Sequence, residues 1–297
     1  MKLVTMGSVA VGLATWVVVL GSTGLAQSLP SPKPFLVFDG TLYSTKPDLS
    51  AYGIRPITLA YAGNFGPDWN KQTDRLPELP AVQAVAREAQ QKGHVVVLDI
   101  EHWPLNGSPD SVRDSLTKYM TVLDWFRAAA PGLSVGYYGA PPVRNYWGAV
   151  EDTSNQERQS WMEENDQLRS LAGAVDVLFP SLYTLYPDQA GWKKYAIAQI
   201  EEARRYGGGK PVYVFLWPQY HESNLTLGGR YLPADYWLLE LETAKVYADG
   251  IVIWGGWGSD NRPVKWDENA PWWKVTKKFM KSGDQSPPTA PTSVTVH

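Results

Sequence analysis

Short apolar runs alternate with longer segments of helical periodicity along this chain, and this alternation constrains the fold more than any other feature. The runs are rich in β-branched residues and almost continuously apolar, as expected of parallel strands covered on both faces. They lie at residues 35–39, 57–61, 95–99, 133–138, 175–179, 212–216 and 251–254. Helical patterns lie at residues 80–92, 110–129, 157–172, 189–206, 234–248 and 271–281. About seven strand–helix units predict an α/β fold, a parallel (β/α) barrel, TIM-like and distorted, over residues 35–281.

The two ends of the sequence differ from this central region. Residues 1–26 have the pattern of a signal peptide, with Lys2 as the positive charge, an apolar stretch at 9–20 and small residues at 24–26. A membrane anchor is the alternative, although the apolar stretch is short. Residues 27–34 predict an extended linker, and residues 282–297 a disordered tail rich in Ser, Thr and Pro. We therefore expect a secreted or periplasmic protein with no stable membrane insertion after cleavage.

Composition excludes several classes of function. The 297-residue chain has no Cys, which rules out disulfides, thiolate metal sites and a thiol nucleophile. Its net charge of -3 gives no footprint for nucleic acid. Its four His form no zinc motif, and no Gly-x-Ser-x-Gly or Gly-x-Gly-x-x-Gly motif is present, so we expect no metal and no cofactor. The 14 Trp and 16 Tyr favour a protein that handles a polysaccharide, because sugar rings stack on aromatic faces; core packing accounts for part of them. We expect the protein to be a monomer.

Polar and aromatic residues follow the predicted strands at their carboxyl ends. Barrel enzymes build their active sites on that face. The residues are Asp39, Tyr61, Asp99, Glu101, Tyr138, Tyr183, Trp217 and Trp254.

Asp99 and Glu101 are the strongest catalytic candidates in this set. Residues two apart on a strand point to the same side, with Cα atoms roughly 6.5–7 Å apart. Repulsion between two such carboxylates raises the pKa of one, and a protonated carboxylic acid is the group that protonates a glycosidic oxygen. A surface acidic pair in a loop is the alternative reading, which the preceding apolar run 95–98 disfavours.

The segment 98–104, Leu-Asp-Ile-Glu-His-Trp-Pro, resembles the Asp-Trp-Glu-x-Trp-Arg-Pro segment of the hyaluronidase family of glycoside hydrolases. Further segments resemble that family in the same order. They are Ile-Thr-Leu-Ala-Tyr at 57–61 with Gly66-Pro67, Gly-Tyr-Tyr-Gly-Ala-Pro at 136–141, Phe-Pro-Ser-Leu-Tyr at 179–183, Pro-Val-Tyr-Val-Phe at 211–215 and Gly-Ile-Val-Ile-Trp-Gly at 250–255.

This resemblance implies a substrate-assisted, retaining glycosidase that cleaves an N-acetylhexosamine polymer. Glu101 would be the general acid and then the base, and Asp99 would orient the acetamido group. Tyr138 and Tyr183 would hydrogen-bond around that group, above a floor formed by Trp254. Tyr61, Asp39, Trp103 and Trp217 are expected to contact the substrate as well. For Tyr138, Tyr183 and Trp254, a place in the barrel core is the alternative.

Departures from the family pattern leave the substrate open. Ile100 replaces the family's Trp, the Arg after Trp103 is absent, and the slightly acidic charge does not favour a polyanion such as hyaluronan. Two rival functions remain. One is a muramidase barrel of the lysozyme type, and the other is a barrel that binds carbohydrate without cleaving it.

Overall fold

The computed structural model describes residues 34–66, 69, 74–151, 155–258 and 260–282. The predicted signal peptide, the linker up to residue 33 and the tail from residue 283 lie outside the described residues. Within the described part, no helix combines the length and apolarity needed to cross a membrane.

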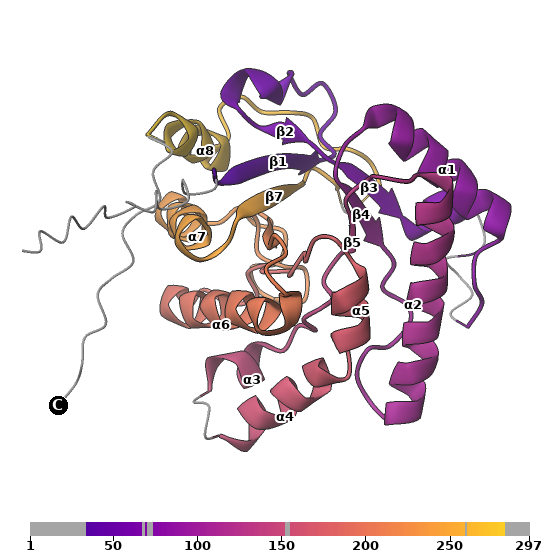
Figure 1. Ribbon diagram of the computed structural model, residues 1–297. Helices are drawn as coiled ribbons and strands as arrows, with labels where there is room; N and C mark the ends of the chain where they lie inside the picture. Colours follow the sequence, from indigo (N-terminus) through magenta and orange to yellow (C-terminus); the bar gives the residue numbers. More distant parts are fainter. Residues whose placement is uncertain (1–33, 67–68, 70–73, 152–154, 259, 283–297) are drawn as a thin grey trace, which may run out of the picture. The chain divides into compact units, whose positions relative to one another are not determined.

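Parallel strands form a barrel at the centre of the described region (Figure 1). One sheet has the order β2-β1-β7-β6 and the other the order β3-β4-β5, and every strand pair is parallel. The short β2 and β3 follow one another in the chain and join the first sheet to the second. The strands are β1 (Leu36–Thr41), β2 (Arg55–Pro56), β3 (Thr58–Tyr61), β4 (Val96–Asp99), β5 (Val135–Tyr137), β6 (Tyr213–Leu216) and β7 (Gly250–Gly255).

Residues 176–182 close the barrel between β5 and β6, where we predicted a strand at 175–179. The structure corrects that prediction, because the segment forms isolated bridges and not a regular strand. Leu178 and Leu182 donate backbone hydrogen bonds to Pro211 and Phe215 of the β6 side. Pro180 lies between the two donors and has no N–H to continue the ladder. The predicted α/β barrel is confirmed, with this irregular segment as its main distortion.

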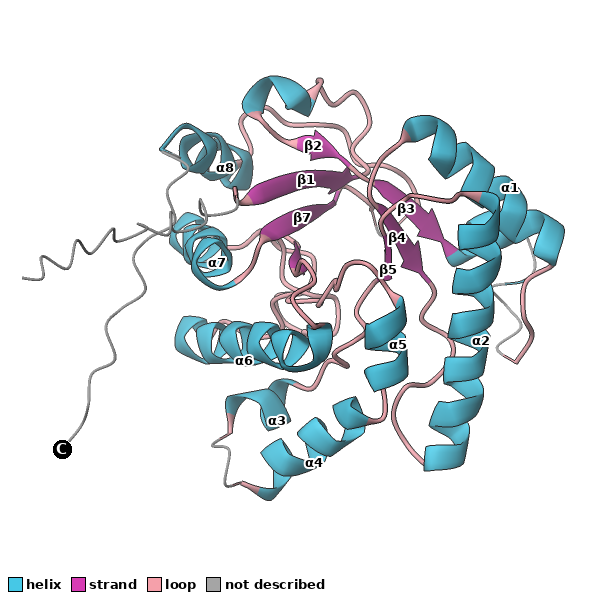
Figure 2. Cartoon of the chain, in the orientation of Figure 1, coloured by secondary structure: helices cyan, strands magenta, loops and turns pink. Residues whose placement is uncertain are grey.

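Helices surround the barrel (Figure 2). The predicted helix at 157–172 is in fact two helices, because a tight turn at Gln167 and Leu168 separates them. A short helix at Tyr146–Val150 was not predicted. The helices are α1 (Leu79–Lys92), α2 (Pro109–Ala129), α3 (Tyr146–Val150), α4 (Gln156–Asp166), α5 (Arg169–Ala174), α6 (Gln189–Gly207), α7 (Ala234–Tyr247) and α8 (Pro271–Ser282), with 3-10 turns at Leu49–Tyr52 and Ala62–Phe65.

Two hydrophobic clusters divide the interior. The larger lies between strands and helices and takes up fully buried indoles such as Trp161, Trp192 and Trp237, so core packing explains part of the tryptophan excess. The smaller contains Phe38, Val97, Phe179, Phe215 and Val252 together with Tyr138, Tyr183 and Trp217. The last three follow strand ends, so this cluster leads directly to the candidate site.

Candidate active site

The two carboxylates lie together at the carboxyl end of β4. Asp99 is the last residue of the strand, and Glu101 follows it two residues later. Ile100 between them is 1% exposed and belongs to the cluster under the helices, so it faces away from the carboxylates. The Tyr119 hydroxyl of α2 donates hydrogen bonds to the carbonyls of Ile100 (2.9 Å) and Trp103 (3.2 Å), which holds the backbone where the strand ends.

A cleft of about 450 Å³ opens above the pair. Asp99 and Glu101 line it, and they also line a second cavity of about 440 Å³ on the side of Tyr61. The expected arrangement, with both carboxylates facing one cavity, is therefore present. Side chains from four further strand ends complete the larger cleft, and they include Tyr138, Tyr183, Trp217 and Trp254.

Aromatic rings form the wall of this cleft. Trp254 stacks on Tyr183 with ring centroids 5.7 Å apart and meets Trp217 edge-on at 4.9 Å. Its indole N–H donates to the Tyr61 hydroxyl at 3.0 Å, which fixes the orientation of the ring. Tyr138 lies 5.9 Å from Tyr183 between ring centroids. These rings come from separate strand ends, and their mutual packing leaves little rotational freedom for any of them.

Burial perturbs the acidity of the groups in the cleft. Burial, together with the negative charge of Glu101, raises the pKa of Asp99 to about 7. Burial also raises the pKa of Glu101, and the nearby Arg144 guanidinium opposes that rise. The two carboxylates are mutually repulsive, so the pair loses its protons in two separate steps and holds one proton between them. Burial raises the pKa of Tyr61 to about 12, so its hydroxyl stays protonated.

Arg144 is a site residue that the sequence did not reveal. It lies in the loop after β5 and lines the cleft beside Glu101 and Tyr138. Its guanidinium donates a long hydrogen bond of 3.4 Å to Ser181 Oγ, which is also 3.0 Å from the Tyr138 hydroxyl. The one available signal was its place three residues after Gly-Tyr-Tyr-Gly-Ala-Pro, at the carboxyl end of a strand.

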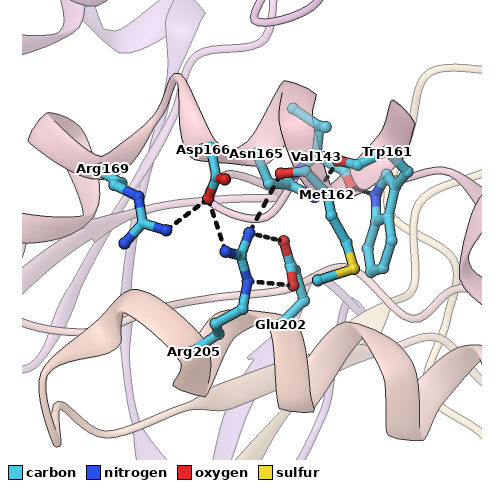
Figure 3. Close-up of polar contacts among 8 residues, drawn as sticks. All are labelled: Val143, Trp161, Met162, Asn165, Asp166, Arg169, Glu202 and Arg205. Carbon is cyan, nitrogen blue, oxygen red and sulfur yellow. Dashed lines mark hydrogen bonds and ion pairs between the residues drawn. The ribbon is translucent and has the colours of Figure 1, made fainter. Parts of the chain in front are cut away.

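The backbone next to Arg144 is held in place by α4 (Figure 3). The buried Asn165 accepts a hydrogen bond from Val143 N at 2.9 Å, and the Trp161 indole donates to Val143 O at 3.0 Å. On the other side of α4, Arg205 of α6 pairs with Asp166 (2.7 Å) and with Glu202, as Figure 3 shows. The backbone that carries the Arg144 side chain is therefore held in place by α4, which α6 holds in turn.

Two of the expected substrate contacts lie elsewhere. Asp39 accepts hydrogen bonds from Lys46 Nζ and Thr41 Oγ1, both at 2.6 Å, and it lines none of these cavities. Trp103 is 2% exposed and packs on Tyr119, although its edge contributes to a smaller cavity beside Glu101. His221 and Glu222, which we had not proposed as site residues, line the main cleft.

The arrangement has the groups that acid–base chemistry on a sugar requires. It offers a proton donor and a second carboxylate, hydroxyl donors on Tyr138 and Tyr183, and an aromatic face on Trp254. Within the described residues, no three His, Asp or Glu side chains come together as a metal site would require.

Comparison with known proteins establishes the fold. No model of a protein family matches this sequence, and no curated protein is significantly similar to it. Among solved structures, bee venom hyaluronidase superposes with a TM-score of 0.56 at 18% identity, over 83% of this chain and 96% of the other. The same enzyme in complex with a hyaluronic acid tetramer gives 0.56 at 19% identity, over 83% and 95%. A modular endo-beta-1,4-mannanase from Cellulomonas fimi gives 0.48 at 13% identity, over 80% and 56%. At these identities the likeness concerns the fold, and the chain shares the (β/α) barrel of bee venom hyaluronidase.

Proposed function

We propose that this protein is a secreted glycoside hydrolase that cleaves an N-acetylhexosamine-containing polysaccharide by a substrate-assisted, retaining mechanism. The observation that carries the proposal is the Asp99–Glu101 pair, buried enough for both pKa values to be raised, inside an aromatic cleft at the carboxyl end of a barrel. A site that only binds sugars has no need of two interacting acids. The fold shared with bee venom hyaluronidase is compatible with this function.

In the first step, Glu101 gives its proton to the glycosidic oxygen as the bond to the anomeric carbon breaks. The acetamido oxygen of the substrate attacks that carbon and forms an oxazolinium-type intermediate. Asp99 accepts a hydrogen bond from the acetamido N–H and stabilises the positive charge that develops on the oxazolinium-type intermediate. In the second step, the Glu101 carboxylate takes a proton from water as the water oxygen attacks the anomeric carbon. The bond from that carbon to the acetamido oxygen breaks, the acetamido group is regenerated, and the original configuration is restored.

The raised pKa of Asp99 has a role in this mechanism. Without substrate, the single proton of the pair resides mainly on Asp99, whose pKa is raised to about 7. An acetamido N–H that donates to Asp99 stabilises its charged form and lowers its pKa. The proton then belongs to Glu101, the residue that must deliver it. Binding of an N-acetylated sugar therefore transfers the proton to Glu101, whereas a sugar without the acetamido group leaves it on Asp99.

The direct test is a screen of the purified protein on hyaluronan, chondroitin, chitin, peptidoglycan and poly-N-acetylglucosamine or poly-N-acetylgalactosamine. We expect cleavage of at least one polymer, and we expect Glu101→Gln to lower kcat roughly 100- to 10,000-fold while the protein stays folded and still binds. Glu88→Gln, an exposed glutamate on α1, is the matched control and keeps full activity.

The mechanism and the activity can fail separately. A thiazoline analogue of the oxazolinium intermediate should inhibit the active enzyme competitively, and an active enzyme that ignores it has another mechanism. Binding of polymer without cleavage by any preparation would replace the hydrolase with a carbohydrate-binding barrel.

A further inference from the structure

A fourth cavity continues the catalytic cleft on the side of the loops after β6 and β7. It has a volume of about 650 Å³ and shares Trp217, Glu222, Trp257 and Gly258 with the cleft that holds the carboxylates. The shared residues make the two spaces one groove. A substrate unit at Asp99 and Glu101 therefore has room for a covalently attached neighbour in this direction.

Trp257 stands at the junction with its indole uncovered. Among the tryptophans that the structure describes, Trp147 at 55% and Trp257 at 41% are the most exposed. Unlike Trp147, Trp257 lines both this cavity and the cleft with the carboxylates, and its indole offers a flat apolar face on which the C–H face of a sugar ring can stack.

The backbone around Trp257 is fixed before any ligand binds. Trp257 forms an antiparallel β-bridge with Pro263, and Val264 N donates a hydrogen bond to Gly256 O at 2.8 Å. Gly256 has a φ of 83°, and a Cβ at this position would lie 2.5 Å from Tyr43 N. The backbone at Gly256 therefore packs directly against the loop that follows β1. A rigid platform binds without the cost of ordering it first.

The opposite wall supplies polar groups for sugar hydroxyls. The loop after β6 contributes Glu222, Thr226 and Arg230, which are all exposed. Asn224 on the same loop accepts hydrogen bonds from Thr226 N (3.1 Å) and Leu227 N (2.9 Å), and this keeps the loop folded. One carboxylate and one guanidinium give the wall no net charge, which suits an uncharged sugar unit.

We infer that Trp257 forms a second sugar-binding subsite, in which an uncharged pyranose next to the cleaved unit stacks on the indole while the loop after β6 binds its hydroxyls. The inference rests on the proposed function, because it assumes that the carboxylate pair receives a sugar. It makes the protein selective for longer chains.

The test measures kcat/KM for an oligosaccharide series, from disaccharide to octasaccharide, of the polymer that the wild type cleaves. For Trp257→Ala we expect the ratio of kcat/KM on longer chains to kcat/KM on the shortest cleavable oligosaccharide to fall about tenfold relative to wild type, mainly through KM, which corresponds to roughly 1.4 kcal/mol of stacking. Trp257→Tyr keeps an aromatic face and should retain most of the activity on longer chains. Trp147→Ala removes the other exposed indole and should match the wild type at every length. Thermal unfolding checks that all variants are folded.

Two results would overturn the subsite: an equal loss at every chain length, or no loss at any. Calorimetric titration of the same series separates this failure from that of the proposed function. If the wild type cleaves nothing but binds longer oligosaccharides more tightly, and Trp257→Ala abolishes that gain, the subsite stands and the hydrolase does not. If nothing binds, both are wrong.

Discussion

At the scale of single residues, the site depends on how one proton is divided between two carboxylates. In the proposed mechanism, Glu101 holds this proton as the acid, and Asp99 is ionised and accepts a hydrogen bond from the acetamido N–H. Activity therefore peaks where the pair carries one proton, giving a bell-shaped kcat/KM profile. The alkaline limb marks the loss of that last proton, near the value of about 7 to which the pKa of Asp99 is raised.

Arg144 acts on Glu101, whose pKa its positive charge lowers. In the enzyme–substrate complex, where Glu101 holds the proton, the alkaline limb of kcat reports the pKa of this acid. Arg144→Gln removes the cation, so we expect the alkaline limb of kcat to move to higher pH, and to stay near the wild-type position in Arg144→Lys, which keeps the charge. A pH–rate profile of the three proteins decides this, and a limb that moves equally in both variants would assign Arg144 a steric role.

The residues that sequence could reveal are those tied to a strand. Asp99 and Glu101 could be placed at one cavity because they follow an apolar run two residues apart, a spacing that fixes their common side. Tyr138, Tyr183 and Trp254 could be placed at the same cleft because they follow the carboxyl ends of predicted strands. Arg144 and Trp257 lie in loops, where side-chain direction depends on tertiary contacts such as those of Val143 with Asn165, and no local periodicity encodes such contacts.

At the scale of elements, the apolar runs predicted where each strand lies but not how regular it is. Segment 176–182 has the composition of a strand, yet Pro180 interrupts its ladder. The helical pattern at 157–172 continues through the turn at Leu168, since the same face stays buried on both sides of the break. Burial therefore determines the apolar pattern of the sequence, whereas backbone hydrogen bonds determine where each strand or helix begins and ends.

The irregular segment also depends on a close approach to β5 at Gly136. A Cβ there would lie 2.2 Å from Val177 O and 2.9 Å from the Phe179 ring, and the first of these atoms belongs to backbone that cannot rotate away. We therefore expect Gly136→Ala to lower the free energy of unfolding by about 2–3 kcal/mol, measured by urea denaturation. Gly173→Ala, in α5 with open space around it, is the control and should be neutral or stabilising by up to about 1 kcal/mol. A neutral Gly136→Ala would mean that the barrel can widen here.

At the scale of the whole molecule, the barrel carries a fully buried carboxyl that the proposed chemistry does not use, on Glu240. Glu240 of α7 is fully buried, and Thr184 donates a hydrogen bond to one of its oxygens. Thr184 follows Tyr183 of the active site, so this carboxyl helps to join the helix layer to the catalytic loop. Burial raises the pKa of Glu240 well above its usual range, and the protein therefore folds with this side chain protonated.

Through Glu240, the stability of the molecule should fall as pH rises. The unfolded chain releases the Glu240 proton above a pKa of about 4.3, whereas the native state keeps it, so the native state binds more protons. Each pH unit between the two pKa values lowers the free energy of unfolding by about 1.4 kcal/mol through this residue. Asp99 acts in the same direction, but only up to a pH of about 7.

Glu240→Gln is neutral at every pH and nearly isosteric with the protonated acid. We expect its free energy of unfolding, relative to wild type, to improve as the pH is raised from 5 in urea titrations, until the wild-type Glu240 itself ionises in the native state. Glu242→Gln changes an exposed glutamate on the same helix and should run parallel to wild type throughout. If the Glu240→Gln and wild-type curves are parallel as well, Glu240 is ionised in the native state, and the buried link between α7 and the catalytic loop carries a charge.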